Sequence, residues 1–98
     1  MARQRYVVAY DIRDELRLRR VANVAKDYGH RLQYSVFVCD LSDTELLWLK
    51  HDLGAVMNQG EDSVVIIDLG PAMTRGQDCF EFIGPRQYDL PQSGPVIW

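Results

Sequence analysis

Residues 6–11, YVVAYD, decide the fold of this 98-residue chain. Most of them are β-branched or aromatic, and apolar side chains occur at both odd and even positions, which predicts a central strand covered on both faces. From Asp14 the spacing becomes helical and continues to Gly29, a residue typical of a helix C-terminus. The apolar residues that share one stripe of this helix are Leu18, Val21, Ala22, Ala25 and Tyr28. A buried strand that leads into an amphipathic helix therefore begins the domain.

The middle of the chain repeats this alternation. Residues 31–40, RLQYSVFVCD, indicate extended structure and should bend near Ser35 into two short strands. Ser42 and Glu45 stand at the spacing of a capping box and begin a second amphipathic helix, which should end near Asn58. This part of the chain is therefore expected to contribute two strands and one helix.

Two further strands are expected downstream. Residues 63–69, SVVIIDL, form a second continuously apolar stretch, and residues 79–83 follow a loop that contains glycine, proline and aspartate. The complete order predicts an α+β domain at residues 1–84. This domain is expected to be a ferredoxin-like βαββαβ sandwich, with two helices on one face of a mainly antiparallel sheet and an extra C-terminal strand.

Residues 85–98 are expected to form a proline-rich linker and a C-terminal strand. Three prolines and a glycine exclude helix and interior strand from residues 85–95, yet the chain finishes on Val96, Ile97 and Trp98. Two explanations stay open: the tail packs on its own domain, or it is exchanged with a second copy whose sheet edge it completes. Because two strands lack a polar face, a homodimer that buries sheet against sheet is the expected assembly.

The composition is that of a single folded domain. Hydrophobic residues make up 47% of the chain and charged residues 26%, which excludes a disordered chain, and 98 residues leave no interior for a second domain. No apolar run reaches the ~18 residues of a membrane-spanning helix, so a cytoplasmic protein is expected. Cys39 and Cys79 are far apart and indicate buried free thiols more than a disulfide framework or a zinc site.

Charge is distributed unevenly along the chain. The net charge is −3, but residues 1–31 carry eight basic and four acidic side chains, a net charge of +4. A basic face is typical of nucleic-acid binding, although the same residues also fit an ordinary solvated helix. The candidate cluster is Arg17, Arg19 and Arg20, of which the buried stripe of the helix leaves at least two facing solvent.

Asp11 is the residue that the pattern singles out for chemistry, because a central strand ends there. Two interpretations are open: a turn or capping residue, or a ligand of a divalent cation. One carboxylate is a poor metal site, but a twofold axis near the strand end would bring two copies of Asp11 to bound Mg2+. Such an ion can polarise a phosphoryl oxygen and activate water, which is the chemistry of phosphodiester hydrolysis. His30 and His51 are isolated in the sequence and indicate surface residues.

The sequence resembles a known family, the small universal CRISPR-associated adaptation protein, which is the second core Cas protein. The resemblance covers nearly the whole chain and is carried by residues 7–21 (VVAYDIRDELRLRRV), 28–41 (YGHRLQYSVFVCDL) and 62–69 (DSVVIIDL) in this order. It implies a ferredoxin-like homodimer whose first-strand aspartates, Asp11 here, face one another across the interface. It also implies a metal-dependent endoribonuclease or double-strand DNA nuclease that uses Mg2+, with Mn2+ as a substitute.

The resemblance assigns roles to further residues. Tyr10 is placed beside Asp11 in catalysis, and Ser35 and Phe37 line the site or the interface. Arg20 and Arg31 also stand at positions that the family associates with the site. With Arg17 and Arg19 of the basic cluster, they are the residues expected to bind nucleic acid.

One departure from the family affects the arginines. Some members carry two arginines two residues apart in the first helix, ending at the position of Arg20, whereas Leu18 stands at the earlier position here. The roles of the individual arginines therefore do not transfer from the family to this chain.

The resemblance also implies an alternative without catalysis. In this alternative the dimer is a bridge that holds duplex DNA for the adaptation integrase of the CRISPR system, and the basic helix suits either role. A third hypothesis is a ferredoxin-like toxin-related or ligand-binding regulatory domain, which would not need the arginine cluster together with Asp11. The expected partners are a second copy of the chain, the adaptation integrase, and DNA or RNA, with no membrane.

Overall fold

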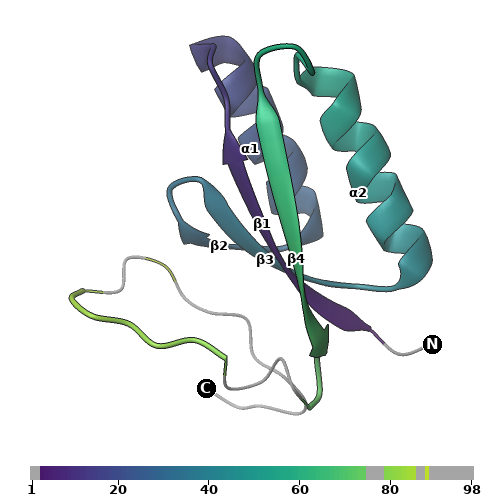
Figure 1. Ribbon diagram of the computed structural model, residues 1–98, viewed down its shortest axis with the longest axis vertical. Coiled ribbons are helices and arrows are strands. Elements are labelled where there is room, and N and C mark those ends of the chain that lie inside the picture. Colours follow the sequence, from purple (N-terminus) through teal and green to yellow (C-terminus); the bar gives the residue numbers. More distant parts are fainter. Residues whose placement is uncertain (1–2, 75–78, 86–87, 89–98) are drawn as a thin grey trace.

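The structure of the chain, a computed structural model, describes residues 3–74, 79–85 and 88. The four strands form one sheet in the order β2-β3-β1-β4, and every neighbouring pair is antiparallel. Figure 1 shows both helices on the same face of that sheet. This is the βαββαβ order and the α+β class that the sequence predicts. The elements are β1 (Gln4–Asp11), α1 (Glu15–Tyr28), β2 (His30–Gln33), β3 (Val36–Leu41), α2 (Asp43–Val56) and β4 (Ser63–Pro71).

Local signals in the sequence set the ends of both helices. Asp14 caps α1, where its carboxylate accepts a hydrogen bond of 3.0 Å from a backbone N–H of the first turn. Ser42 and Glu45 form the expected capping box at the start of α2. Gly29 ends α1, although its φ of −166° is extended and not left-handed. A glycine is needed there because an added Cβ would collide with the Val38 carbonyl oxygen.

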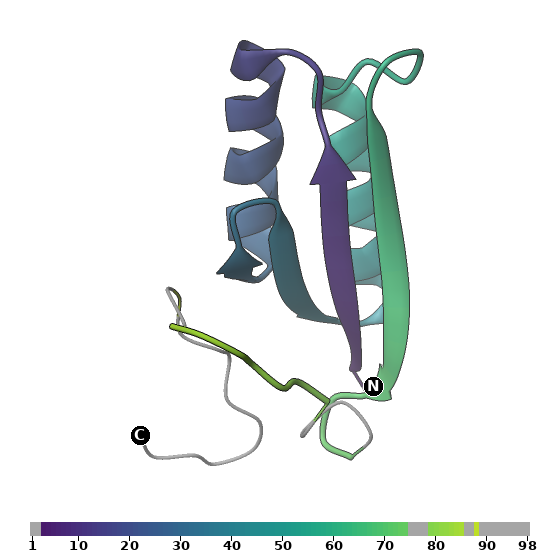
Figure 2. The same ribbon diagram turned by 60° about the vertical axis from the view of Figure 1, so that its left-hand side comes forward.

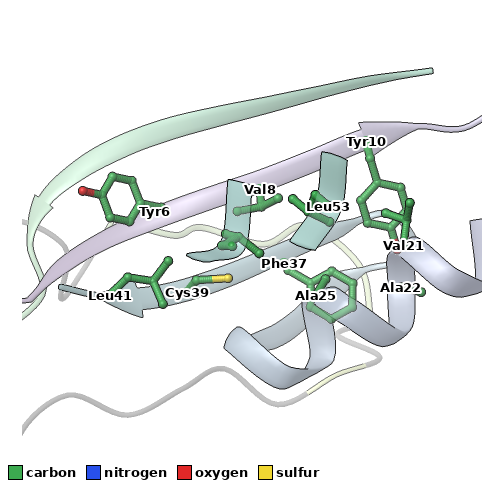
Figure 3. Packing of buried hydrophobic residues seen from close by; sticks show 11 residues of the cluster. Tyr6, Val8, Tyr10, Val21, Ala22, Ala25, Phe37, Cys39, Leu41 and Leu53 are labelled. Atoms are coloured by element: carbon green, nitrogen blue, oxygen red, sulfur yellow. The ribbon is translucent and has the colours of Figure 1, made fainter. Parts of the chain in front are cut away.

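The core lies between the helices and the sheet (Figure 3). Side chains alternate along β1, so that Tyr6, Val8 and Tyr10 face the helices. The buried residues that complete this core from β3 and the helices are Phe37, Cys39, Leu41, Val21, Ala22, Ala25, Leu49 and Leu53. Because the intervening residues of β1 face the other way, Asp11 lies on the opposite face of the sheet.

That opposite face is open along β4. Val65 and Ile67 pair with Ala9 and Val7 of β1 on the side away from the helices, and they remain 52% and 47% exposed. Within the described residues of one chain this side of β4 is therefore open, and its expected cover by a second copy stays a prediction. An exposed apolar strip of this kind is typical of an interface.

The C-terminal part of the described chain differs from the prediction. Residues 79–83 were expected to form a last strand, but they have no regular secondary structure. Figures 1 and 2 show residues 79–85 running beyond the end of the sheet and not along the edge of β4. A strand needs a neighbouring strand for its backbone hydrogen bonds, and an apolar pattern does not say where that neighbour is.

Other expectations are met or lie outside the described residues. The bend near Ser35 is confirmed, because β2 ends at Gln33 and β3 begins at Val36. No helix among the described residues is long and apolar enough to cross a membrane. The expected exchange of residues 96–98 with a second copy falls on residues that the structure does not describe.

Candidate functional site

Asp11 is the last residue of β1 and lies at the end of the open sheet face. Its register partner on β4 is Ser63, and the two line a shallow hollow of about 260 Å³ together with Ala9 and Val65. The Asp11 side chain is 66% exposed, and the Arg13 guanidinium lies 3.5 Å from its Oδ2 atom. The carboxylate is therefore accessible to a ligand that approaches the open face.

One copy of the chain supplies few ligands for a metal ion. Within residues 3–74, 79–85 and 88, no group of three or more His, Cys, Asp or Glu side chains is placed to hold a cation. Mg2+ commonly binds through one or two carboxylates, with waters and substrate phosphates as its other ligands. Asp11 fits as one such ligand, and a second copy of the chain is one source of a further carboxylate.

Tyr10 points to the other side of the sheet, as expected for the residue before Asp11 in a strand. Its side chain is 6% exposed, faces α1 (Figure 3), and stacks on Phe37 with the ring centroids 6.2 Å apart. Burial raises the pKa of the Tyr10 hydroxyl, which therefore stays protonated at neutral pH. The structure does not bring this hydroxyl to the Asp11 carboxylate, although the family resemblance placed both in one catalytic site.

The three arginines of α1 have different environments. Arg17 is ion-paired, with its Nε atom 2.8 Å from Asp62 and a terminal nitrogen 3.0 Å from Glu61. Arg19 and Arg20 are exposed, and neither forms an ion pair with the described residues. The expectation that at least two of the three face solvent is met by Arg19 and Arg20, whereas Arg17 fastens α1 to the loop before β4.

Arg31, Ser35 and Phe37 lie around the β2–β3 turn. Phe37 is fully buried in the core, and Ser35 accepts a hydrogen bond of 3.1 Å from the Tyr10 backbone N–H through its carbonyl oxygen. The Arg31 guanidinium carbon lies 5.1 Å from the centroid of the Phe37 ring. Arg31 and Phe37 therefore group with Tyr10 on the helix side of the sheet, away from the Asp11 carboxylate.

Two carboxylates join distant parts of the fold. Asp40 binds the buried Arg5 guanidinium through hydrogen bonds of 2.7 and 2.9 Å. Asp62 has no exposed side-chain area and accepts hydrogen bonds from Arg17 and from two backbone N–H groups. The partners are 35 and 45 residues apart in the chain, so no local pattern could have revealed either pair.

Comparisons with known proteins identify the family. Residues 4–75 match the model of the family described as CRISPR associated protein Cas2. The CRISPR-associated endoribonuclease Cas2 of Geobacter sulfurreducens is 40% identical over 67 residues, which are 68% of this chain and 70% of that protein.

Two crystal structures have the same fold. Cas2 of Streptococcus pyogenes superposes with a TM-score of 0.72 at 34% identity, covering 82% of this chain and 99% of that one. A hypothetical protein of Thermus thermophilus superposes with a TM-score of 0.76 at 34% identity, covering 92% and 99%. The chain therefore belongs to the Cas2 family of CRISPR-associated proteins.

Proposed function

We propose that the protein acts in CRISPR adaptation as a nucleic-acid-binding homodimer with a Mg2+-dependent endonuclease site centred on Asp11. The observation that carries this proposal is the position of Asp11, an exposed carboxylate at the end of a central strand on the open face of the sheet. A second copy related by a twofold axis through that face would bring a second Asp11 toward the first. The related protein named as an endoribonuclease supports a phosphodiester substrate.

The residues around Asp11 have defined parts in this proposal. Two copies of Asp11 would hold the cation. Bound Mg2+ would polarise a phosphoryl oxygen of the substrate and activate a water molecule for attack. Arg13 lies 3.5 Å from Asp11 and is close enough to bind a phosphate oxygen beside the ion. In this proposal Tyr10 supports β1 from the helix side, where its hydroxyl is buried, and takes no part as acid or base.

The substitution Asp11→Asn tests the metal site. It keeps the size of the side chain and removes the charge that holds the cation. Cleavage of single-stranded RNA and of duplex DNA should therefore fall on the order of 100-fold or more while the melting temperature is unchanged. Asp27→Asn makes the same chemical change at an exposed position of α1 and should cleave like the parent. Undiminished cleavage by Asp11→Asn that also resists a chelator would place the active site elsewhere.

A second function is favoured by the exposed arginines of α1. Arg19 and Arg20 are free to contact phosphates, and such contacts position a duplex without reading its sequence. They suit a non-catalytic bridge that holds DNA for the adaptation integrase. Duplex binding by a parent protein that cleaves neither RNA nor DNA with Mg2+ or Mn2+ would select this function over the nuclease.

A further inference from the structure

A pocket of about 270 Å³ lies on the helix side of the sheet, between α1 and the β2–β3 hairpin. Figure 2 shows β2 beside the C-terminal half of α1. The polar residues that line the pocket are Tyr10, Arg19, Asn23, Lys26, Arg31 and Tyr34. The three from α1 are four and three residues apart, so they follow one stripe of the helix. The Asp11 carboxylate faces the other side of the sheet and does not line this pocket.

The charged residues of the pocket are all cationic. Arg19, Lys26 and Arg31 come together there, and none of them forms an ion pair with a carboxylate in the described part of the chain. Four arginines elsewhere in the described chain do pair with aspartate or glutamate. Like charges that share a pocket without a carboxylate repel one another, and a bound anion relieves that repulsion.

Two buried polar atoms of these residues, the Tyr10 hydroxyl and the Arg31 Nε atom, form no hydrogen bond of normal geometry with the described residues, although the Arg31 guanidinium is a neighbour of the Tyr10 hydroxyl. Tyr10 is more than nine-tenths buried and faces the pocket. A phenol O–H in this position can donate a hydrogen bond into the pocket. Buried donors normally have a hydrogen-bond acceptor. An anionic oxygen bound in the pocket, or a water held beside that anion, would provide an acceptor for these two groups.

Three aromatic rings hold the Arg31 side chain. Its guanidinium carbon lies 5.1 Å from the ring centroid of Phe37, 5.7 Å from that of Tyr88 and 5.8 Å from that of Tyr34. Stacking restricts the guanidinium and uses its face, which leaves the N–H groups at its edge for a ligand. A guanidinium prepared in this way is suited to a bidentate contact with a phosphate.

We propose that this pocket binds a phosphate monoester, carried by a free nucleotide or by the end of a nucleic-acid strand. The pocket is near the lower limit of small-molecule sites, so it admits a terminal phosphate and excludes a duplex. Tyr34 lies at its rim with 66% of its surface exposed, where a base can stack. The site does not use Asp11, and either this proposal or the nuclease proposal can fail without the other.

Binding measurements distinguish the two sources of the phosphate. The probes are AMP against adenosine, and a pentanucleotide DNA with a 5′-phosphate, with a 3′-phosphate or with neither. If the source is a strand end, a phosphorylated strand binds at least about tenfold tighter than the unphosphorylated one. If the source is a free nucleotide, only AMP has this advantage over adenosine. The proposal is overturned if the phosphate gives no gain in affinity in either comparison.

Matched variants locate the effect in the pocket. Arg31→Gln and Lys26→Gln should each remove most of the advantage of the phosphorylated ligand. Lys50→Gln removes a positive charge at an exposed position of α2 outside the pocket and should keep that advantage. If Arg31→Gln fails to fold, Lys26→Gln still tests the proposal, because Lys26 is exposed and its substitution should leave the fold intact. An advantage that survives both pocket variants, or that Lys50→Gln abolishes equally, contradicts the proposal.

Discussion

Asp62 has no exposed side-chain area and accepts hydrogen bonds from the Arg17 guanidinium and from the backbone N–H groups of Arg13 and Asn58. These donors, with Arg17 first, hold the pKa of the Asp62 carboxyl well below its usual range. A carboxyl whose pKa is lowered by folding stabilises the fold above its unfolded pKa of ~4. That contribution is lost as the pH falls below this value.

Asp62→Asn should therefore destabilise the protein in a pH-dependent way. The amide turns an N–H donor toward groups that are themselves donors, so the melting temperature at pH 7 should fall by about 5 °C or more. The difference in melting temperature between the variant and the parent should shrink between pH 5 and pH 3, because the parent loses the stabilisation from its Asp62 carboxylate over this range. Thermal unfolding followed by circular dichroism at pH 7, 5 and 3 measures both effects.

The matched variant for this experiment is Asp27→Asn, at an exposed position of α1, which should melt like the parent. An Asp62→Asn protein with the parent's melting temperature at pH 7, or with a deficit independent of pH, would show that the ion pair does not hold α1 in place.

Single residues were predictable from the sequence only where the signal is local. Asp11 follows an apolar strand, so its place at a sheet end could be predicted, and its exposure agrees with that place. The pairing of Arg17 with Asp62 spans 45 residues, and helical spacing could not reveal it. Strand alternation places the Tyr10 side chain on the helix side of the sheet, opposite Asp11. The family resemblance grouped the two residues in one site and did not take this alternation into account.

At the scale of elements, Gly29 shows how a helix end is fixed by a neighbouring strand. An added Cβ would lie against the Val38 carbonyl oxygen and the Cys39 sulfur of β3. Gly29→Ala should therefore lower the free energy of unfolding by about 1–3 kcal/mol, because backbone must shift to admit the methyl group. Urea denaturation measures this loss.

Gly54 gives a matched control within α2. A Cβ there meets only the Gln59 side-chain nitrogen at 3.4 Å, so Gly54→Ala should stabilise the protein by roughly 0.5–1 kcal/mol through helix propensity. Equal effects of the two substitutions would mean that the contact between α1 and β3 does not require glycine at position 29.

The elements that the sequence predicted correctly have their determinants within a few residues. The capping box at Ser42 and Glu45 and the bend between β2 and β3 are examples. The strand expected at residues 79–83 failed because strand formation depends on a partner, and the described residues offer none at that place. A second copy of the chain is where such a partner would be found if the proposed dimer forms.

At the scale of the whole molecule, the basic N-terminal third is less positive than its composition suggests. Arg3, Arg5, Arg13 and Arg17 are neutralised by ion pairs. The cations of this third without an ion pair in the described part of the chain are on α1 and at β2: Arg19, Arg20, Lys26 and Arg31.

Duplex binding should therefore depend on Arg19 and Arg20. Four phosphate contacts in a dimer predict a slope of roughly −3 to −4 for log K against log salt. The double substitution Arg19→Ala and Arg20→Ala should flatten this slope toward zero and weaken binding to all sequences alike. Lys50→Ala, at an exposed position of α2, should leave the slope unchanged. A double variant with the parent's slope would mean that this face of α1 is only solvated.

The open sheet face along β4 predicts how two copies associate. Ile67→Lys places a charge in the proposed interface and should weaken the dimer roughly tenfold or more, as measured by sedimentation. Leu47→Lys makes a similar change on α2, where Leu47 is 65% exposed, and should leave the dimer intact. A parent protein that sediments as a monomer at micromolar concentration, or equal effects of both variants, would exclude this interface.

The measurement that tests the Asp11 site most directly is the binding of Mn2+, a paramagnetic substitute for Mg2+, by the protein at concentrations where the proposed dimer forms, in the presence of an oligonucleotide. Electron paramagnetic resonance should detect about one or two bound ions per dimer. Asp11→Asn should remove this binding, and Asp27→Asn should preserve it. Mn2+ binding of equal affinity and stoichiometry in the Asp11→Asn variant and in the parent would contradict the assignment of Asp11 as the metal ligand.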